Sequence, residues 1–509
     1  MHPPGDTVLH MLRRAADRTP DSDAIVVLGG RKLTYRELSE RAAAWAAIVS
    51  DFGVGKRIGV LLTNGCEVME SLLGVLASGN QAVLLNPGYT ARELAAILPD
   101  AEMEAVITFD AQAAPLCEAM NTTSMHSTVL SANASAAWPD AALVRKGLSL
   151  VTPGLDELAL LQFTGGTTGK PKGVMLTHRA LTMNIQQRDA LLPTRPGVDR
   201  ILCMTPIFHA YALAMAVFPS LFSGGALVIL PRYRPEGALS AIAEEGITLF
   251  AGTPTIYNGL VAHPHFRSAE FGSLRGAFSG AAPLSVEVLT AWEEVTRVPI
   301  YEGYGLTEAT AVLSFNPMTG KRKPGSVGIP LPGTEIQIVD VETGQVLKER
   351  GAVGEVRARG PQMMTGYRNR PNDTASILRN GWLYTGDIGY LDEDGYLFLR
   401  SRKSDMAIVS GYNVYPREVE EVLHLHPAVL EAVAVGMPDP YRGESMAVLV
   451  SLRAGMQTSG EDLIAHCAKN LAKYKIPTMV EVAAQLPKTG AGKLDRQSAR
   501  RILQELKAR

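Results

Sequence analysis

Short apolar runs alternate with longer amphipathic stretches through the first half of the chain. Residues 25–28 and 57–63 have the apolar character of buried strands, whereas residues 35–50 and 68–78 repeat their apolar positions with the period of a helix. Further strand-like runs, each near a helical segment, occur at residues 105–108, 226–230 and 248–251. Because alternating strands and helices favour parallel sheets covered by helices on both faces, we expect an α/β fold.

The pattern changes twice in the second half of the chain. Between residues 325 and 396, runs such as EIQIVD and GEVRARG alternate polar and apolar residues and are separated by glycines, which predicts a small β-rich section. The pattern beyond Arg402 predicts strands at residues 406–409 and 430–436, and helices at residues 417–425 and 495–506. We therefore expect a large N-terminal domain over residues 1–402 and a small, mobile α+β domain over residues 403–509.

Composition limits the possible partners. A chain of 509 residues is too long for one ordinary core, so at least two domains are expected. Hydrophobic residues make up 46% and charged residues 20%, which is typical of a soluble globular protein. With 49 basic and 51 acidic residues the net charge is −2, so neither nucleic acid nor an anionic membrane is expected as the main partner.

The sequence favours a cytoplasmic protein without integral membrane contact. Residues 1–21 lack the apolar run of a signal peptide. The most apolar stretch, residues 210–230, is broken by Pro219, Gly224 and Gly225, so we expect a short helix and a strand buried in the core. The four cysteines are scattered and form no CxxC pair, which favours reduced thiols over a zinc site or a disulfide framework.

The strongest local signal is the segment TGGTTGKPKGVMLTH at residues 164–178, which follows an apolar, strand-like run. Its glycines allow main-chain N–H groups to converge on an anion, and its threonines, Lys170 and Lys172 add hydroxyls and positive charge. The segment lacks the Walker spacing. Taken alone, it is compatible with a phosphate-binding loop and with a flexible surface loop.

This segment closely resembles the signature loop of the adenylate-forming superfamily, which contains acyl- and aryl-CoA synthetases, peptide-synthetase adenylation domains and beetle luciferases. Further motifs of that superfamily follow in its order over residues 164–493, and as strings they are most similar to bacterial long-chain fatty-acyl-CoA ligases. The resemblance implies that ATP, Mg2+ and coenzyme A are used. It also implies a set of phosphate-binding residues: Thr164, Gly165, Gly166, Thr167, Thr168, Gly169 and Lys172.

The segments PIFHAYAL (residues 206–213) and SGAAPL (residues 279–284) resemble the next two motifs. The first implies that His209 orients the substrate and gates the thiol path, beside Phe208 and Tyr211 on the acyl path. A histidine in an apolar run is more often a satisfied core residue, and only the motif favours a functional role. The second implies adenine contacts from Gly280, Ala281 and Ala282.

Two motifs carry the implied nucleotide and metal contacts. In EGYGLTEAT (residues 302–310), the resemblance implies that Tyr304 and Gly305 contact adenine and that Thr307 contacts the α-phosphate. Glu308 would hold Mg2+, a hard ion that prefers oxygen ligands.

In YTGD (residues 384–387), Asp387 would accept hydrogen bonds from the ribose hydroxyls, because a carboxylate only accepts. Arg402 follows fifteen positions later, at the spacing of the superfamily's arginine that reaches the ribose or phosphate.

The implied catalytic and thiol-binding residues of the small domain come from two further motifs. SGYNVYPRE (residues 410–418) resembles the segment that lines the thiol tunnel after domain rotation, with Ser410, Gly411 and Tyr412 on the path. PKTGAGKLDR (residues 487–496) carries the superfamily's catalytic lysine, which corresponds to Lys493. A cation is needed between the attacking carboxylate and the α-phosphate, where negative charge gathers in the transition state.

The hinge departs from the superfamily pattern. Ser404 stands at the pivot, where Asp or Lys is usual, with Asp405 beside it. Ser401 and Ala407 also differ from the usual residues, so the balance of the two half-reactions stays open. The insertion that marks ligases serving carrier proteins is absent after Arg350, which favours coenzyme A as the acceptor.

The sequence therefore predicts an acyl-CoA ligase that activates a fatty or other lipophilic acid as acyl-AMP and transfers the acyl group to coenzyme A. An aryl-acid CoA ligase and an enzyme specialised in one half-reaction remain alternatives. A non-catalytic acyl- or nucleotide-binding protein is an alternative of another class. The expected partners are a small carboxylic acid, ATP and coenzyme A. The oligomeric state is left open, with a homodimer among the options.

Overall fold

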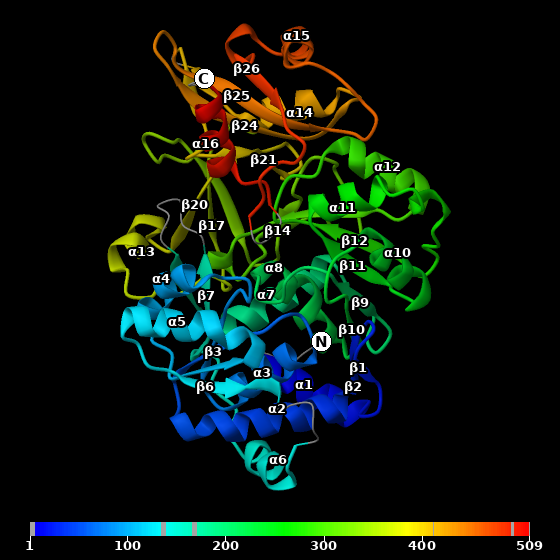
Figure 1. The fold of residues 1–509 in the computed structure, drawn as a ribbon, viewed down its shortest axis with the longest axis vertical. Helices are drawn as coiled ribbons and strands as arrows, with labels where there is room; N and C mark the ends of the chain where they lie inside the picture. Colours follow the sequence, from blue (N-terminus) through cyan, green and yellow to red (C-terminus); the bar gives the residue numbers. More distant parts are fainter. Residues whose placement is uncertain (1–5, 134–138, 165–170, 411, 490–492, 508–509) are drawn as a thin grey trace.

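The computed structural model describes residues 6–133, 139–164, 171–410, 412–489 and 493–507. The large domain contains two sheets with parallel centres (Figure 1). The first has the order β15 (Ile329–Pro330), β14 (Ser314–Phe315), β13 (Ile300–Tyr304), β12 (Gly276–Ser279), β11 (Leu249–Gly252), β9 (Arg200–Cys203), β10 (Ala226–Ile229), β1 (Asp23–Val27) and β2 (Lys32–Thr34). The second has the order β18 (Gly366–Tyr367), β8 (Lys172–Thr177), β7 (Leu158–Thr164), β4 (Gln81–Leu84), β3 (Arg57–Leu61), β5 (Ala105–Thr108) and β6 (Thr128–Ser131).

Helices cover these sheets, as the alternating pattern predicts (Figure 1). They are α1 (Val8–Arg18), α2 (Tyr35–Val49), α3 (Cys66–Ala77), α4 (Ala91–Ala101), α5 (Ala113–Thr123), α6 (Ala141–Leu148), α7 (His178–Leu191), α8 (Ala210–Ala212), α9 (Phe218–Ser223), α10 (Pro235–Glu244), α11 (Pro254–Val261) and α12 (Val286–Thr296). Local chemistry sets several helix starts. Thr34 and Thr90 form capping boxes with Glu37 and Glu93, and satisfy backbone N–H groups that a helix leaves free.

A third, mostly antiparallel sheet confirms the predicted β-rich section. Its order is β16 (Glu335–Val339), β17 (Gly354–Arg359), β20 (Trp382–Leu391) and β19 (Leu378–Arg379), with β21 (Leu397–Arg402) paired to β20. The short helix α13 (Pro371–Ile377) precedes β19, and the positive φ of Asn380 and Gly381 turns the chain from β19 into β20. This sheet lies between the larger sheets and the end of the chain (Figure 1).

The end of the chain forms a small α+β domain with its own apolar core, at the top of Figure 1. Its sheet has the order β23 (Tyr412–Val414), β22 (Ala407–Val409), β25 (Gly443–Leu452) and β24 (Val429–Asp439), and β26 (Met479–Val482) runs parallel to β25. The helices are α14 (Pro416–His424), α15 (Gly460–Asn470) and α16 (Arg496–Lys507). The predicted fold class, a large α/β domain followed by a small α+β domain, is therefore confirmed.

The apolar stretch 210–230 lies in the core, as expected. It forms α8, a π-helical turn η4 (Leu213–Val217), α9 and β10, and most of its side chains are buried. Within the described parts of the chain, no helix has the length and apolar character needed to cross a membrane.

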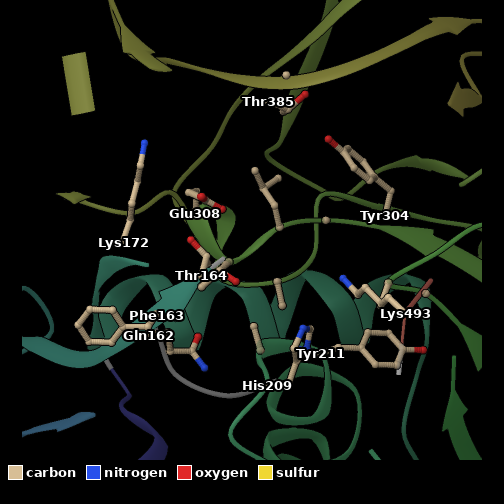
Figure 2. A pocket seen from close by; sticks show the side chains of 18 of the residues that line it. Gln162, Phe163, Thr164, Lys172, His209, Tyr211, Tyr304, Glu308, Thr385 and Lys493 are labelled. Carbon is tan, nitrogen blue, oxygen red and sulfur yellow. The ribbon is translucent and has the colours of Figure 1, made fainter. Parts of the chain in front are cut away.

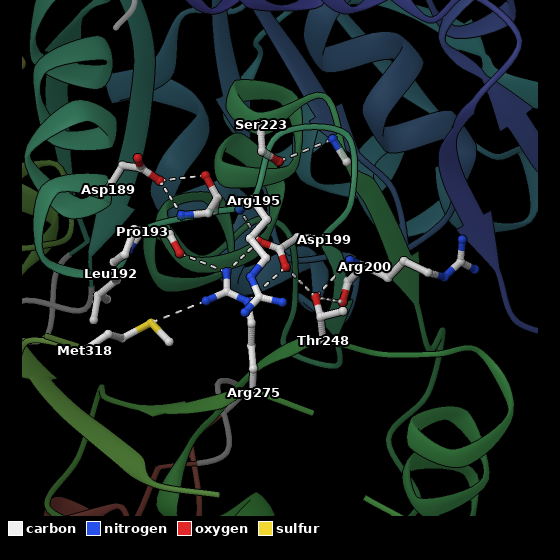
Figure 3. Close-up of polar contacts among 12 residues, drawn as sticks. Asp189, Leu192, Pro193, Arg195, Asp199, Arg200, Ser223, Thr248, Arg275 and Met318 are labelled. Atoms are coloured by element: carbon white, nitrogen blue, oxygen red, sulfur yellow. Dashed lines mark hydrogen bonds and ion pairs between the residues drawn. The ribbon is translucent and has the colours of Figure 1, made fainter. Parts of the chain in front are cut away.

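A buried ionic cluster joins the first sheet to the segment that follows α7 (Figure 3). The Asp199 side chain is fully buried and accepts hydrogen bonds from Arg275 at 3.0 and 2.6 Å, from the Thr248 hydroxyl at 2.7 Å and from the Arg195 N–H at 2.6 Å. Burial opposes ionisation, but these donors outweigh it and hold the pKa of Asp199 below its usual value. The cluster fixes the chain that leads into β9.

Candidate active site

A cavity of about 960 Å3 lies where β4, β7, β12 and β13 end, and it is closed on one side by residues of the small domain (Figure 2). Its lining includes Thr164 at the end of β7, Gly280 and Ala281 after β12, and Tyr304 at the end of β13. Ligands of open α/β sheets bind at the carboxyl ends of the strands. The position of this cavity therefore marks it as the candidate site.

His209 forms part of the cavity floor and caps α8, because its Nδ1 accepts a hydrogen bond from the Tyr211 N–H at 3.2 Å. Burial, together with the nearby positive charge of Lys493, lowers the pKa of His209 to about 3. The ring is therefore neutral at physiological pH. With Nδ1 accepting, the proton is assigned to Nε2.

Lys493 extends its amine into the cavity beside His209 and Tyr211 (Figure 2). The Thr489 N–H donates to the Lys493 carbonyl at 2.7 Å, which anchors the segment that carries the lysine. Burial and the positive charge of Arg402 lower the pKa of Lys493, and Asp387 partly opposes them. Among the described residues, no side chain pairs with the amine, so its charge faces the open cavity.

Arg402 and Tyr304 line the cavity, and both contact Asp387, which is buried beside them and lies outside the lining. Asp387 and Arg402 are paired across β20 and β21, and Arg402 Nε lies 2.8 Å from Asp387 Oδ1. The Tyr304 hydroxyl donates to Asp387 Oδ2 at 2.5 Å. Burial raises the pKa of Asp387, and Arg402 and Tyr304 oppose that rise. Both carboxylate oxygens keep lone pairs that a ligand hydroxyl can use.

Glu308 lies on the opposite wall, with Thr164 and Lys172 nearby (Figure 2). The Tyr367 hydroxyl donates to Glu308 Oε1 at 2.6 Å, and no described residue contacts Oε2. No group of three His, Cys, Asp or Glu side chains in the described ranges could hold a metal on its own. A single carboxylate fits Mg2+ that arrives with a nucleotide, because phosphates and water then supply the remaining oxygen ligands.

Small residues let the nucleotide side of the cavity pack closely. A Cβ at Gly280 would lie 2.6 Å from the Tyr211 ring, and one at Gly305 would lie 1.6 Å from the Ala311 carbonyl oxygen. Ala281 has a φ of 68°, which is strained for a residue with a side chain. Ala281 lines the cavity, whereas Ala282 lies outside its lining.

The structure brings most of the predicted site residues to this cavity. Besides Thr164, Lys172, His209, Tyr211, Gly280, Ala281, Tyr304, Gly305, Glu308, Arg402 and Lys493, the lining includes Phe208, Thr307 and Ser404. Asp387 and Ala282 lie outside it, although Asp387 contacts two lining residues. Asp405 points elsewhere and pairs with Arg496 at 3.5 Å inside the small domain. Residues 165–170, which include most of the predicted phosphate loop, and Gly411 lie outside the described residues.

The predicted thiol-path residues Ser410 and Tyr412 do not line the cavity in this arrangement of the domains. Tyr412 is exposed, and its ring stacks on Tyr474 at 4.6 Å. Ser410 has a φ of 52° and its N–H donates to the Arg442 carbonyl at 2.8 Å. The structure therefore presents the lysine side of the small domain to the cavity, and the tunnel segment lies away from it.

Sequence reasoning missed many lining residues, among them Tyr367, Glu355 and Arg379, which carry polar groups. Tyr367 orients Glu308, and Glu355 pairs with Lys403 at 3.0 Å. None of the three belongs to a motif that carried the resemblance. Their proximity to the site depends on the pairing of β17, β18 and β19, which no local sequence pattern predicts.

The fold places a cavity at the carboxyl ends of parallel strands, and Lys493 of the small domain reaches into it. Residues 12–368 match the AMP-binding enzyme family, and residues 418–493 match the AMP-binding enzyme C-terminal domain. The chain belongs to the AMP-binding enzyme family.

Relatives and solved structures agree with this assignment. A long-chain-fatty-acid–CoA ligase of Bacillus subtilis (strain 168) is 38% identical over 99% of this chain and 95% of its own. A feruloyl-CoA synthase of an Amycolatopsis species is 35% identical over 96% of this chain and 97% of its own. The crystal structure of the anthranilate CoA ligase AuaEII with anthranoyl-AMP matches with a TM-score of 0.90 at 26% identity, over 100% of this chain and 99% of the other.

The protein is an AMP-forming acyl-CoA synthetase, which uses ATP, Mg2+ and coenzyme A. This confirms the predicted superfamily, reaction class and cofactors. Its small-molecule substrates are ATP, coenzyme A and a carboxylic acid.

Proposed function

We propose that the cavity carries out both half-reactions on a fatty or other lipophilic acid, with Lys493 acting in the first. One observation carries the proposal: the Lys493 amine lies in the cavity without a carboxylate partner, between the floor at His209 and the wall at Arg402. Leaving a cation half-buried and unpaired opposes stability, and such groups cluster at functional sites.

In the first half-reaction, a carboxylate oxygen of the acid attacks the α-phosphorus, the bond to the β-phosphate breaks, and pyrophosphate leaves. Lys493 neutralises charge that builds up on the attacking carboxylate and the α-phosphate. Neutral His209 offers its Nε2–H to a carboxylate oxygen and so orients the acid. Thr307 contacts the α-phosphate, and Glu308 holds Mg2+, which would neutralise phosphate charge.

The adenosine of ATP lies between Tyr304 and the segment Gly280–Ala281, and its ribose hydroxyls donate to Asp387. Without nucleotide, Tyr304 and Arg402 already contact the two carboxylate oxygens. The ribose therefore joins an existing cluster, and the Tyr304 ring is held at the cavity wall before the nucleotide binds. Such preorganisation reduces the ordering cost of binding.

In the second half-reaction, the small domain rotates about the hinge at Ser404 and Asp405. Lys493 then leaves the cavity, and Ser410, Gly411 and Tyr412 approach it to line the thiol path. The thiol of coenzyme A attacks the acyl carbon, the bond from that carbon to the AMP oxygen breaks, and the thiol proton is released. The exposed Tyr412 supports this exchange, because its ring has apolar surface to bury after rotation.

The apolar part of the cavity favours a lipophilic acid. Phe208, Tyr211, Val312 and Phe315 supply a wall without an unpaired charge, which suits a hydrocarbon chain or an aromatic ring. The 38% identical Bacillus subtilis relative supports a fatty acid. An aryl acid is the second candidate, because three of these four residues are aromatic and because aryl-acid ligases are among the similar proteins.

The test is a screen of straight-chain and aryl acids for acid-dependent AMP formation with ATP, Mg2+ and coenzyme A. We expect the highest kcat/KM with a straight-chain acid and a thioester as the product. A preference for an aryl acid would select the second candidate. Nucleotide binding without pyrophosphate release from any acid would instead support a non-catalytic binding protein.

The protein is further proposed to act in the cytoplasm on small molecules alone, without nucleic acid or integral membrane contact. Its near-neutral net charge of −2 supports this proposal.

A further inference from the structure

The cavity mouth carries a cation that the reaction scheme does not use. Five cationic side chains of the described residues line the cavity, and three of them form ion pairs. Lys172 pairs with Asp373 at 3.2 Å, Arg402 with Asp387 at 2.8 Å and Lys403 with Glu355 at 3.0 Å. Over the described residues, Lys493 and Arg379 have no carboxylate partner. Lys493 has a proposed catalytic role, whereas Arg379 has none.

Arg379 is held in place although it lies on the surface. Its Nε donates to the Ser376 carbonyl at 2.7 Å, and its guanidinium carbon lies 4.7 Å from the centre of the Tyr384 ring. Its two terminal nitrogens are left free for a ligand. A cation fixed over an aromatic face loses less conformational entropy on binding than a solvated side chain does.

A second arginine lies next to the same ring. Arg357 donates to the Tyr384 hydroxyl at 2.8 Å, and its guanidinium carbon lies 4.5 Å from the centre of the Trp382 ring. Its other partner is the neutral Gln337. Among the described residues, neither of these two arginines next to the Tyr384 ring pairs with a carboxylate, so both positive charges can attract an anion.

We propose that Arg379, supported by Tyr384 and Arg357, binds the pyrophosphate end of ATP and retains pyrophosphate briefly after the first half-reaction. We call these three residues the arginine–tyrosine site. The proposal rests on the proposed function, since that reaction supplies the pyrophosphate.

The position of the site favours this ligand. Arg379 lies two residues after the end of α13, and α13 contributes Asp373, the partner of Lys172. The Lys172 amine lies over the Tyr367 ring, 5.2 Å from its centre, and the Tyr367 hydroxyl donates a hydrogen bond to Glu308. The arginine–tyrosine site therefore lies next to Lys172 and Glu308, on the side of the cavity where the phosphates of ATP are proposed to bind. The planar guanidinium suits the paired oxygens of a phosphate chain.

The experiment titrates magnesium pyrophosphate into the full-length protein by calorimetry. We expect Arg379→Gln to weaken pyrophosphate binding by about tenfold or more, the usual effect of losing a charged hydrogen bond. Arg379→Lys keeps the charge and should restore part of the affinity. The matched control is Arg359→Gln, because Arg359 contacts the same Trp382 ring but pairs with Glu335 and lies outside the cavity lining. It should bind pyrophosphate as the wild type does.

Steady-state kinetics distinguish between pyrophosphate and the phosphates of coenzyme A as the ligand of this site. In the reverse reaction, Arg379→Gln should raise the KM for pyrophosphate. In the forward reaction, it should leave the KM for coenzyme A unchanged. A rise in the KM for coenzyme A alone would overturn the proposal and assign the site to the phosphates of coenzyme A. Unchanged affinity and unchanged KM values would also overturn it, because Arg379 would then be a surface residue only.

Calorimetry and AMP formation together distinguish a failure of this proposal from a failure of the proposed function. A wild-type protein that binds pyrophosphate through Arg379 but forms no AMP with any acid would contradict the function and leave the anion site standing. A protein that is active but shows no effect of Arg379→Gln would contradict the anion site alone.

Discussion

The cluster around Asp199 and the cluster around Asp387 both place a buried carboxylate beside an arginine, but they differ in what surrounds the pair. Asp199 receives donors from Arg275, Arg195 and Thr248, and its cluster is closed by protein atoms (Figure 3). Asp387 contacts Arg402 and Tyr304, which line a cavity, and Lys493 extends into that cavity without an ion-pair partner among the described residues.

The charges around Asp199 serve to stabilise the fold, whereas the charges around Asp387 are proposed to bind a ligand. In the closed cluster the donors hold the pKa of the carboxylate below its usual value, so ionisation stabilises the fold. In the open cluster burial raises the pKa of Asp387 and lowers the pKa of Lys493, so both charges are less stable than in water. A bound nucleotide and acid would supply the missing partners. Variants of the two clusters should therefore affect different observables.

The largest expected effect is on stability and comes from the closed cluster. Arg275→Ala leaves Asp199 buried without its main partner, which should lower the free energy of unfolding by about 3–5 kcal/mol. Denaturant unfolding measures this change. The control is Arg36→Ala, because Arg36 and Asp21 form an exposed pair whose loss should cost about 0–1 kcal/mol. Equal effects of the two variants would contradict the structural role of the closed cluster.

The closed cluster also predicts a pH dependence with a definite sign. Because the pKa of Asp199 is lowered in the folded protein, its ionisation stabilises the fold above about pH 4, the ordinary range of an aspartate. That contribution should be lost as the pH falls through the lowered pKa. In Arg275→Ala, acid unfolding should therefore begin at a higher pH than in the wild type. Identical acid transitions would argue against this linkage.

In the open cluster, the largest expected effect is on the first half-reaction. Lys493→Ala should slow acyl adenylate formation by about 10²–10³-fold, the usual loss for one electrostatic contact in a transition state. Conversion of preformed acyl adenylate to thioester should continue. Lys488→Ala is a matched control, since Lys488 lies on the same segment but pairs with Glu431 at 2.9 Å. Equal loss of both steps in Lys493→Ala would indicate a structural lysine.

A smaller effect is expected for the nucleotide contact. Asp387→Ala removes a charged acceptor from the ribose and should weaken ATP binding by about tenfold or more. Equilibrium binding of ATP measures the change, and Asp392→Ala, beyond the end of β20, is the control. ATP affinity equal to that of the wild type would exclude Asp387 from the ribose site.

The last prediction concerns the pivot between the two domains, Ser404. Ser404 donates to its neighbour Asp405 at 3.1 Å, a local contact that holds neither domain orientation strongly. A charged pivot that adds about 1–3 kcal/mol to one orientation would shift the ratio of the two half-reaction rates by about 5–150-fold. Rates of both half-reactions in Ser404→Asp and Ser404→Lys test this hypothesis. A ratio that neither substitution changes would make Ser404 a neutral variation.

Local sequence patterns predicted much of the fold, because strands and helices follow from the spacing of apolar residues. The strand expected at residues 105–108 coincides with β5, and the helix expected at residues 417–425 differs from α14 by one residue at each end. The π-helical turn η4 was not predicted, because an apolar run of that kind carries no periodicity that separates it from an α-helix.

For the site, motif strings identified the residues but not their contacts. The approach of Lys493 to His209 depends on how two domains pack, and 283 intervening residues separate the two in the sequence. The Tyr304–Asp387 bond and the arginine–tyrosine site depend on the pairing of strands from distant segments. Pairing of that kind is a long-range property, which the local spacing of residues does not encode.

The most direct test of the two-step account is a single-turnover experiment with isotopically labelled straight-chain acid, ATP and Mg2+, with enzyme in excess. Without coenzyme A, the account predicts one equivalent of pyrophosphate and labelled acyl-AMP that stays on the enzyme. A chase of coenzyme A with excess unlabelled acid should then convert the bound label to labelled acyl-CoA and release AMP. Release of ADP in place of pyrophosphate, or label that appears only as free acid after the chase, would contradict the account.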